Sequence, residues 1–173
     1  MEQTHKTAHH EAGHFIAYLL YIAKEYGYEG LELESLSIIP DGDSFGRLVN
    51  HPDAKYYNIL PVLMAGAASD FILSGENNSF QFLDTLLAEQ MELEGSDSDG
   101  IVELSIFHVT ENSNITEFLH SDFTDVVDNI KKNWEAVQFV ANELISKKLI
   151  EGDDLHNLVI VTAEKLGVEI FDL

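Results

Sequence analysis

The chain has 173 residues, no cysteine, a formal net charge of −22 and 45% hydrophobic residues, which suits one domain with a sizeable core. Nucleic acids and anionic membranes are bound by clustered cations, and a chain with few lysines and the single arginine Arg47 argues against both partners. Without cysteine there is no disulfide, thiolate metal site or cysteine nucleophile, so any metal must be held by histidine and carboxylate.

The N-terminus lacks the basic-then-apolar pattern of a secretory signal. The longest apolar run, residues 15–23, is shorter than the roughly 20 residues that a helix needs to cross a bilayer. We therefore expect a soluble, cytoplasmic protein.

The first part of the chain predicts a helix followed by a β-hairpin. From residue 7 to about residue 26, apolar residues recur on one face at three- and four-residue steps, and Gly27 can end the helix. Residues 31–40 show alternation and β-branched side chains, and residues 44–50 form a second short strand. The turn PDGD between them favours a hairpin with one open edge.

Helices dominate the rest of the chain. A helix over residues 54–75 has a small-residue centre, Ala65 to Ala68, that permits close packing against another helix. The acidic segment EGSDSDG, residues 94–100, predicts a flexible, solvated loop. Apolar periodicity marks the other helical segments, which are residues 78–95, residues 116–150 as one or two helices, and residues 151–167. The expected fold is mainly α with a small β-hairpin or sheet, an α+β class.

The segment TAHHEAGHFIAYLL contains the pattern HExxH, in which His10 and His14 enclose Glu11 and two small residues. Residues four apart share a face of a helix, so both histidines can present an imidazole nitrogen to one zinc ion. Glu11, next to the first ligand, can take a proton from a metal-activated water. The alternative is an ordinary amphipathic helix that carries surface histidines.

The motif and the segments after it resemble the peptidase domain of FtsH-type, membrane-bound AAA+ zinc proteases. HEAGH is the specific part of the resemblance, and less specific similarities follow in the family's order. They are LSIIPDGDSFGRL, PVLMAGAASDFILSG, ENNSFQFLDTLLAEQM and NWEAVQFVANELISKKLIEGDDLHNLV. The resemblance implies one peptidase-like domain over residues 1–173. Its HExxH helix, hairpin and third-ligand helices would occupy residues 1–95, and a C-terminal helical part would occupy residues 100–173.

Two histidines do not complete a zinc site, and the metzincin extension is missing after His14, so a third ligand must come from another element. The resemblance implies an aspartate, but ungapped alignment places Ser79 there, and a serine hydroxyl is a poor zinc ligand. Asp84, a little over one turn further along the same predicted helix, is the first candidate. Asp70, which aligns with a supporting residue near the family's site, is the second. Another group or water is the remaining alternative.

The resemblance implies a zinc metalloendopeptidase that hydrolyses flexible peptides or unfolded proteins. Gly46 aligns with a glycine in the strand that lines the family's cleft, where an open edge could bind an extended peptide. A simple hairpin glycine explains Gly46 equally well. No GxxxxGK[ST] motif occurs, so the activity would be ATP-independent, with a separate ATPase partner or a homo-oligomer as further options. The alternative function is a vestigial metal-binding homologue that acts as a regulatory or interaction module.

Overall fold

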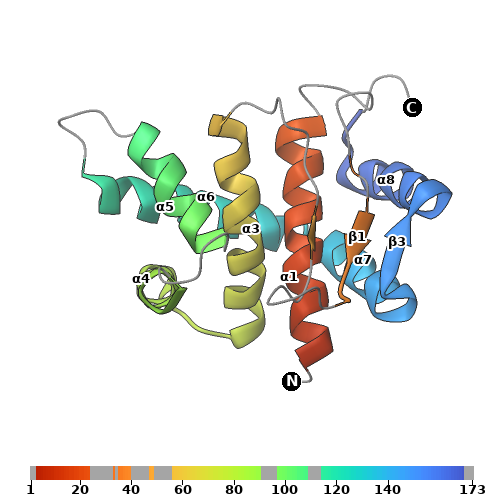
Figure 1. The fold of residues 1–173 in the computed structure, drawn as a ribbon, viewed down its shortest axis with the longest axis horizontal. Coiled ribbons are helices and arrows are strands. Elements are labelled where there is room, and N and C mark those ends of the chain that lie inside the picture. Colours follow the sequence, from red (N-terminus) through yellow and green to blue (C-terminus); the bar gives the residue numbers. More distant parts are fainter. Residues whose placement is uncertain are drawn as a thin grey trace.

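The computed structural model describes residues 3–23, 33, 35–39, 47–48, 56–90, 97–108 and 114–169. These residues form a mainly helical fold with a small antiparallel sheet (Figure 1). Helices α1 (Gln3–Tyr18) and α3 (Tyr56–Ser74) lie side by side at its centre. The predicted mainly α fold with a small sheet is therefore confirmed.

Helix α1 is enclosed along most of its length. Every residue from Thr7 to Tyr18 except His10 is buried, because α3 packs against one side and α7 (Trp134–Lys147) packs against another. A short π-helical segment, η1 (Leu19–Ala23), continues the helix. The single apolar face predicted from the periodicity is thus only part of the buried surface, and the polar motif residues are buried with it.

Small residues let α1 and α3 approach closely. Ala65 and Ala68 of α3 are fully buried. A Cβ added to Gly13 of α1 would lie 2.5 Å from the carbonyl oxygen of Ala65, so only glycine fits at this position. The small-residue centre therefore permits the close helix packing that its sequence predicts, and it sets the position of the HExxH motif against α3.

The other helices pack around this central pair. In chain order they are α4 (Ser79–Gln90), α5 (Asp97–His108), α6 (Ile115–Lys132), α7 and α8 (Gly152–Leu166). Helices α5 and α6 pack on α3, α7 packs on α1, and α8 packs on α7 (Figure 1). One expectation is wrong here, since residues 97–100 of the predicted acidic loop form the first turn of α5.

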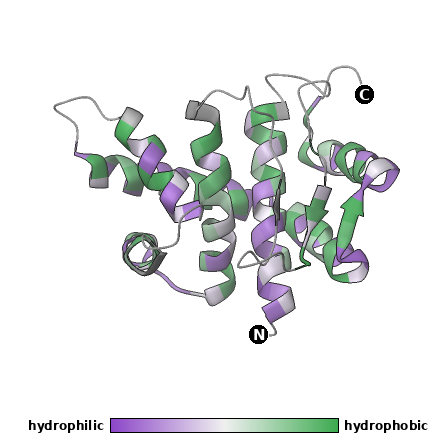
Figure 2. Cartoon of the chain, in the orientation of Figure 1, coloured by the Kyte–Doolittle hydropathy of each residue, from purple (hydrophilic) through white to green (hydrophobic). Residues whose placement is uncertain are grey.

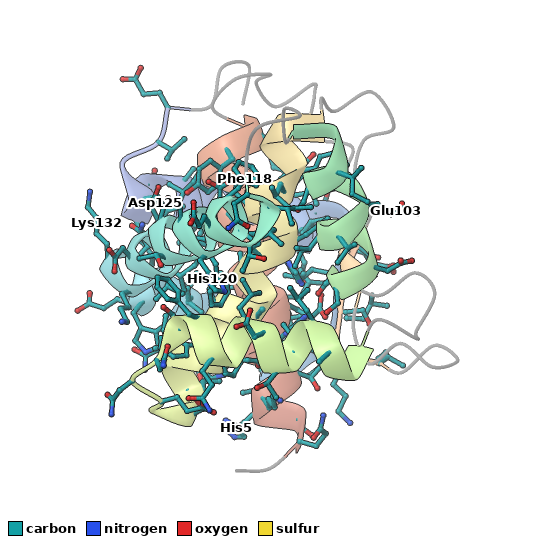
Figure 3. The ribbon with its side chains drawn as sticks, turned by 90° about the vertical axis from the view of Figure 1, so that its left-hand side faces the viewer. His5, Glu103, Phe118, His120, Asp125 and Lys132 are labelled. Atoms are coloured by element: carbon teal, nitrogen blue, oxygen red, sulfur yellow. The ribbon has the colours of Figure 1, made fainter. Side chains whose placement is uncertain are left out.

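Helix α6 illustrates how the sequence pattern builds these elements. Its buried residues recur every three or four positions, and the side chain of Asn114 caps its start by accepting a hydrogen bond from the Thr116 N–H. Asp125 and Lys132 lie on its exposed side (Figure 3). Hydrophobic and hydrophilic residues are interspersed along the helices of the fold (Figure 2).

The sheet joins distant parts of the chain. Strand β1 (Ser35–Ser37) pairs antiparallel with β2 (Arg47–Leu48), as the predicted hairpin requires. It also pairs antiparallel with β3 (Leu149–Glu151), so the strand order is β2-β1-β3 and both edges of β1 are occupied. The segment over residues 116–150, predicted as one or two helices, forms the two helices α6 and α7 and ends earlier than predicted. Helix α7 stops at Lys147, and the positive φ of 66° at Lys148 turns the chain into β3.

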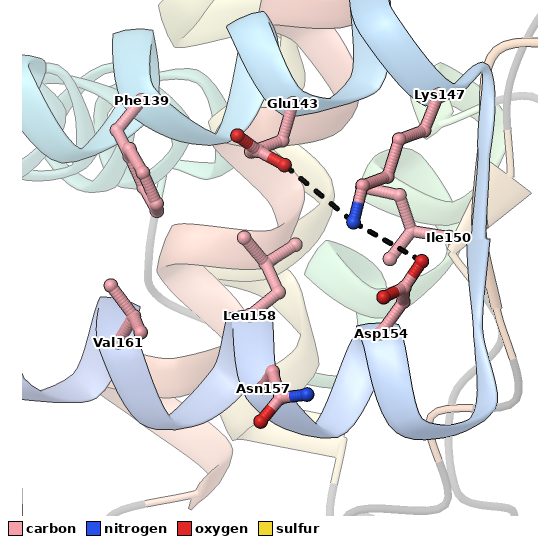
Figure 4. Close-up of a pocket in the computed structure, with 8 residues that line it drawn as sticks. All are labelled: Phe139, Glu143, Lys147, Ile150, Asp154, Asn157, Leu158 and Val161. Atoms are coloured by element: carbon pink, nitrogen blue, oxygen red, sulfur yellow. Dashed lines mark ion pairs between the residues drawn. The ribbon is translucent and has the colours of Figure 1, made fainter.

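A pocket of about 170 Å³ lies between α7, β3 and α8 (Figure 4). Its floor is apolar, with Ile150 and Leu158, and at its rim Lys147 Nζ lies 3.1 Å from Asp154 Oδ2. The HExxH residues do not line this pocket, so it is separate from the site described below.

Among the described residues, no helix is both long enough and apolar enough to cross a membrane.

Candidate metal centre

The two histidines of the motif point their Nε2 atoms at one place. Because His10 and His14 are one helical turn apart on α1, their rings meet edge to face, with centroids 4.7 Å apart and an interplanar angle of 80°. The two Nε2 atoms lie 3.1 Å apart. His14 is buried, while the side chain of His10 keeps 27% of its surface exposed. The pair is thus enclosed but open to solvent at His10.

Asp97, the first residue of α5, completes the cluster. Its Oδ2 atom lies 3.0 Å from His10 Nε2 and 2.9 Å from His14 Nε2, which makes a nearly equilateral triangle of possible ligand atoms. Adjacent ligand atoms around a four-coordinate zinc ion, with bonds of about 2.0–2.1 Å, lie roughly 3.3 Å apart. Shifts of a few tenths of an ångström would fit these three groups to such an ion, and Asp97 is 29% exposed on the solvent side.

The outer nitrogen of each imidazole has an acceptor of its own. His14 Nδ1 donates to the carbonyl oxygen of Val62 at 2.6 Å, and His10 Nδ1 lies 3.1 Å from the Asp70 carboxylate. A carbonyl oxygen can only accept, so the proton of a neutral His14 sits on Nδ1 and its Nε2 carries a lone pair. Lys6 Nζ is 3.7 Å from the same Asp70 oxygen. Partners of this kind are typical of metal-binding histidines, whose orientation they fix.

The charges at the cluster shift the pKa values of its members strongly. Burial acts to lower the pKa of His10, but its hydrogen bonds to Asp70 and Asp97 and their negative charges outweigh burial and raise the pKa to about 10. Burial acts to raise the pKa of Asp97, but the two imidazoles hold that pKa well below its usual range. The lone pairs of His10 Nε2, His14 Nε2 and Asp97 Oδ2 converge on one point. In the absence of a metal, a proton therefore occupies that point.

Glu11 lies beside this cluster and is itself buried, at 5% exposure. Burial raises the pKa of its carboxyl group, and the charges of His14 and His10 oppose that rise. A buried carboxylate with a raised pKa next to a potential metal is suited to accept and release a proton.

The structure separates the other predicted residues. It places Asp70 against His10, as described, but Asp84 lies on α4, where its Oδ1 is 2.8 Å from His120 Nε2 of α6. The ring of Phe80 stacks on His120, with centroids 4.5 Å apart, and His120 is directed toward α4 (Figure 3). Asp84 therefore contacts a different histidine, and Asp97 is the carboxylate that lies against both Nε2 atoms of the histidine pair. Gly46 lies outside the described residues.

Sequence reasoning missed Asp97 because it read residues 94–100 as a loop. A signal was present, since Asp97 and Asp99 precede the apolar residues Ile101 and Leu104, and acidic residues favour the first turn of a helix. That signal predicts a helix start but gives no indication that Asp97 meets the histidines.

No protein-family model and no curated protein matches this chain. The sequence motif and the geometry around it are therefore the features that point to a function.

Proposed function

We propose that the protein is a zinc-dependent peptidase in which His10, His14 and Asp97 hold the metal. The observation that carries this proposal is the convergence of both Nε2 atoms and one carboxylate oxygen, while a separate acceptor engages each Nδ1. Two imidazoles and a carboxylate are a donor set that suits zinc, and three protein ligands leave a position for water or substrate. The resemblance of HEAGH to FtsH-type peptidases supports the same function.

The side chains divide the chemistry between them. Zinc would lower the pKa of a water molecule at its open position and polarise the scissile carbonyl. Glu11 would act as the general base and acid, accepting a proton from water and passing it to the leaving amine, a task that its raised pKa favours. Asp70 and the carbonyl group of Val62 keep the two imidazoles in the orientation that leaves Nε2 free for the ion.

Flexible or unfolded polypeptides are the proposed substrates, cleaved at internal peptide bonds without ATP. No unfolding motor is encoded in these residues, because the GxxxxGK[ST] motif is absent from the sequence. An extended segment of substrate would bring its carbonyl group to the exposed side of the cluster, where His10 and Asp97 are accessible.

The substitution Glu11→Gln tests the function. It keeps the size of the side chain and removes the proton acceptor, so zinc should bind as in the wild type while cleavage falls by at least about 100-fold. The measurement compares zinc content with the cleavage of fluorescently labelled, unfolded casein by both proteins.

Equal zinc binding with equal, negligible cleavage by both proteins would refute the peptidase and leave a metal-binding regulatory module. Absence of zinc from the wild type, with no rise in its melting temperature on zinc addition, would refute both functions.

A further inference from the structure

Gly66 of α3 lies directly behind the two metal-binding nitrogens. A Cβ built on Gly66 would be 2.5 Å from His10 Nε2 and closer still to His14 Nε2. A zinc–nitrogen bond is about 2.0–2.1 Å long, so a methyl group at this position would stand almost as close to both nitrogens as the ion itself. The two imidazoles can therefore occupy their positions only because Gly66 has no side chain.

The backbone of α3 also closes this side of the cluster. Because a Cα–Cβ bond is about 1.5 Å long, the Gly66 Cα lies within about 4 Å of both Nε2 atoms. Atoms at that distance are in van der Waals contact, and neither a water molecule nor a further protein ligand fits between them. An ion at the cluster can therefore take additional ligands only from the side that faces away from α3.

We propose that Gly66 determines which cations the protein binds. By closing one side of the cluster it favours a four-coordinate ion, such as Zn²⁺ or Co²⁺. It disfavours Mg²⁺ and Ca²⁺, which need six or more ligands around them. The proposal rests on the metal centre of the proposed function, but it does not depend on peptidase activity.

The variant Gly66→Ala separates this role from a general effect on folding. Alanine is favoured over glycine inside a helix, which offsets part of the cost of shifting the two imidazoles away from the added methyl group, so the metal-free protein should still fold. Gly100→Ala is the matched control, because its Cβ would lie 2.9 Å from a flexible methyl group of Leu63, also on α3.

Metal binding is measured with Co²⁺ absorption spectra and Zn²⁺ titrations, alongside melting temperatures in chelator. We expect the wild type and Gly100→Ala to give the intense visible bands of four-coordinate Co²⁺. Gly66→Ala should lose these bands and bind Zn²⁺ more than about 100-fold more weakly, while it still unfolds in a single cooperative transition in chelator. An excess of Mg²⁺ or Ca²⁺ should not displace Zn²⁺ from the wild type.

Wild-type affinity and spectra in Gly66→Ala would overturn the proposal, and so would a six-coordinate Co²⁺ spectrum in the wild type. The second outcome decides the matter even if Gly66→Ala does not fold. A wild type that binds Zn²⁺ as expected but cleaves no polypeptide would refute the peptidase alone. A wild type that binds neither Zn²⁺ nor Co²⁺ would refute both proposals.

Discussion

At the scale of single residues, the candidate site depends on where each imidazole keeps its proton. The Val62 carbonyl takes the Nδ1 proton of His14, and Asp70 faces the Nδ1 atom of His10. The remaining nitrogens then meet Asp97 Oδ2, and three lone pairs cannot share one small space without a positive charge between them. A proton or a metal ion can supply that charge, and the proposed zinc site uses this arrangement of acceptors.

Asp97 and Asp84 can be compared directly, because both are aspartates that contact a histidine. We expect Asp97→Asn to weaken zinc binding by more than about 100-fold, since the amide keeps the size but loses the charge that binds the ion. Asp84→Asn should leave the zinc affinity unchanged, because Asp84 contacts His120 instead.

A competition titration against a zinc-binding dye measures both affinities. Loss of zinc from Asp84→Asn, with retention by Asp97→Asn, would show that the described position of α5 is not the one that binds metal.

The raised pKa of His10 makes the stability of the metal-free protein depend on pH. Between the ordinary pKa of 6.5 and the folded value of about 10, the folded chain holds a proton that the unfolded chain has released. This contribution to the free energy of unfolding is therefore complete below pH 6.5 and is lost as the pH rises toward about 10. Urea unfolding in chelator between about pH 6 and pH 9 should show falling stability.

His10→Gln is the control, and its stability should change less over the same pH range. Zinc displaces the proton, so the stabilisation that zinc provides should increase with pH. Stability of the metal-free wild type that rises over this range would contradict the assigned hydrogen bonds of His10.

At the scale of elements, α5 is a helix with little apolar packing to hold its position. Its buried described side chains are two serines and two aliphatic residues, namely Ser98, Ser105, Ile101 and Leu104. Interactions other than apolar packing must therefore contribute to holding this 12-residue helix in place. The contacts of Asp97 with α1 are among those interactions.

We therefore expect zinc to slow hydrogen exchange in α5. Mass spectrometry of deuterium uptake should show stronger protection of α5 with zinc than with chelator, and Asp97→Asn should remove the difference. Helix α8, which does not contribute to the cluster, serves as the internal reference. Equal uptake by α5 in both conditions would mean that its packing on α3 alone holds it in place.

At the scale of the whole molecule, local patterns predicted more than distant contacts. The HExxH helix and its histidine pair were predictable, because residues four apart on a helix must share a face. The β1–β2 hairpin followed from two strand-like segments around a turn. These features depend on residues that are close together in the sequence.

The third ligand and the third strand could not be predicted in this way. Asp97 lies 83 residues after His14, and nothing in the sequence selects it from the chain's 31 acidic residues. Ungapped comparison with the FtsH-type pattern led to Ser79, and Asp84 was the first candidate only as the next aspartate on the same helix. The structure shows that Asp84 of α4 contacts His120 of α6. Strand β3 directly follows α7, and the apolar pattern of that helix continues into the strand. Only the pairing of β3 with β1 distinguishes the strand from a further turn of the helix.

The separation of 83 residues between His14 and Asp97 has a consequence of its own. An ion held by both would be a cross-link that closes a long loop, which is the role that a disulfide plays in other proteins. This chain has no cysteine and therefore no disulfide that a reductant could cleave. Such a cross-link is opened by chelators or by acid instead. The lifetime of the folded molecule would then follow the supply of metal rather than the redox state of its surroundings.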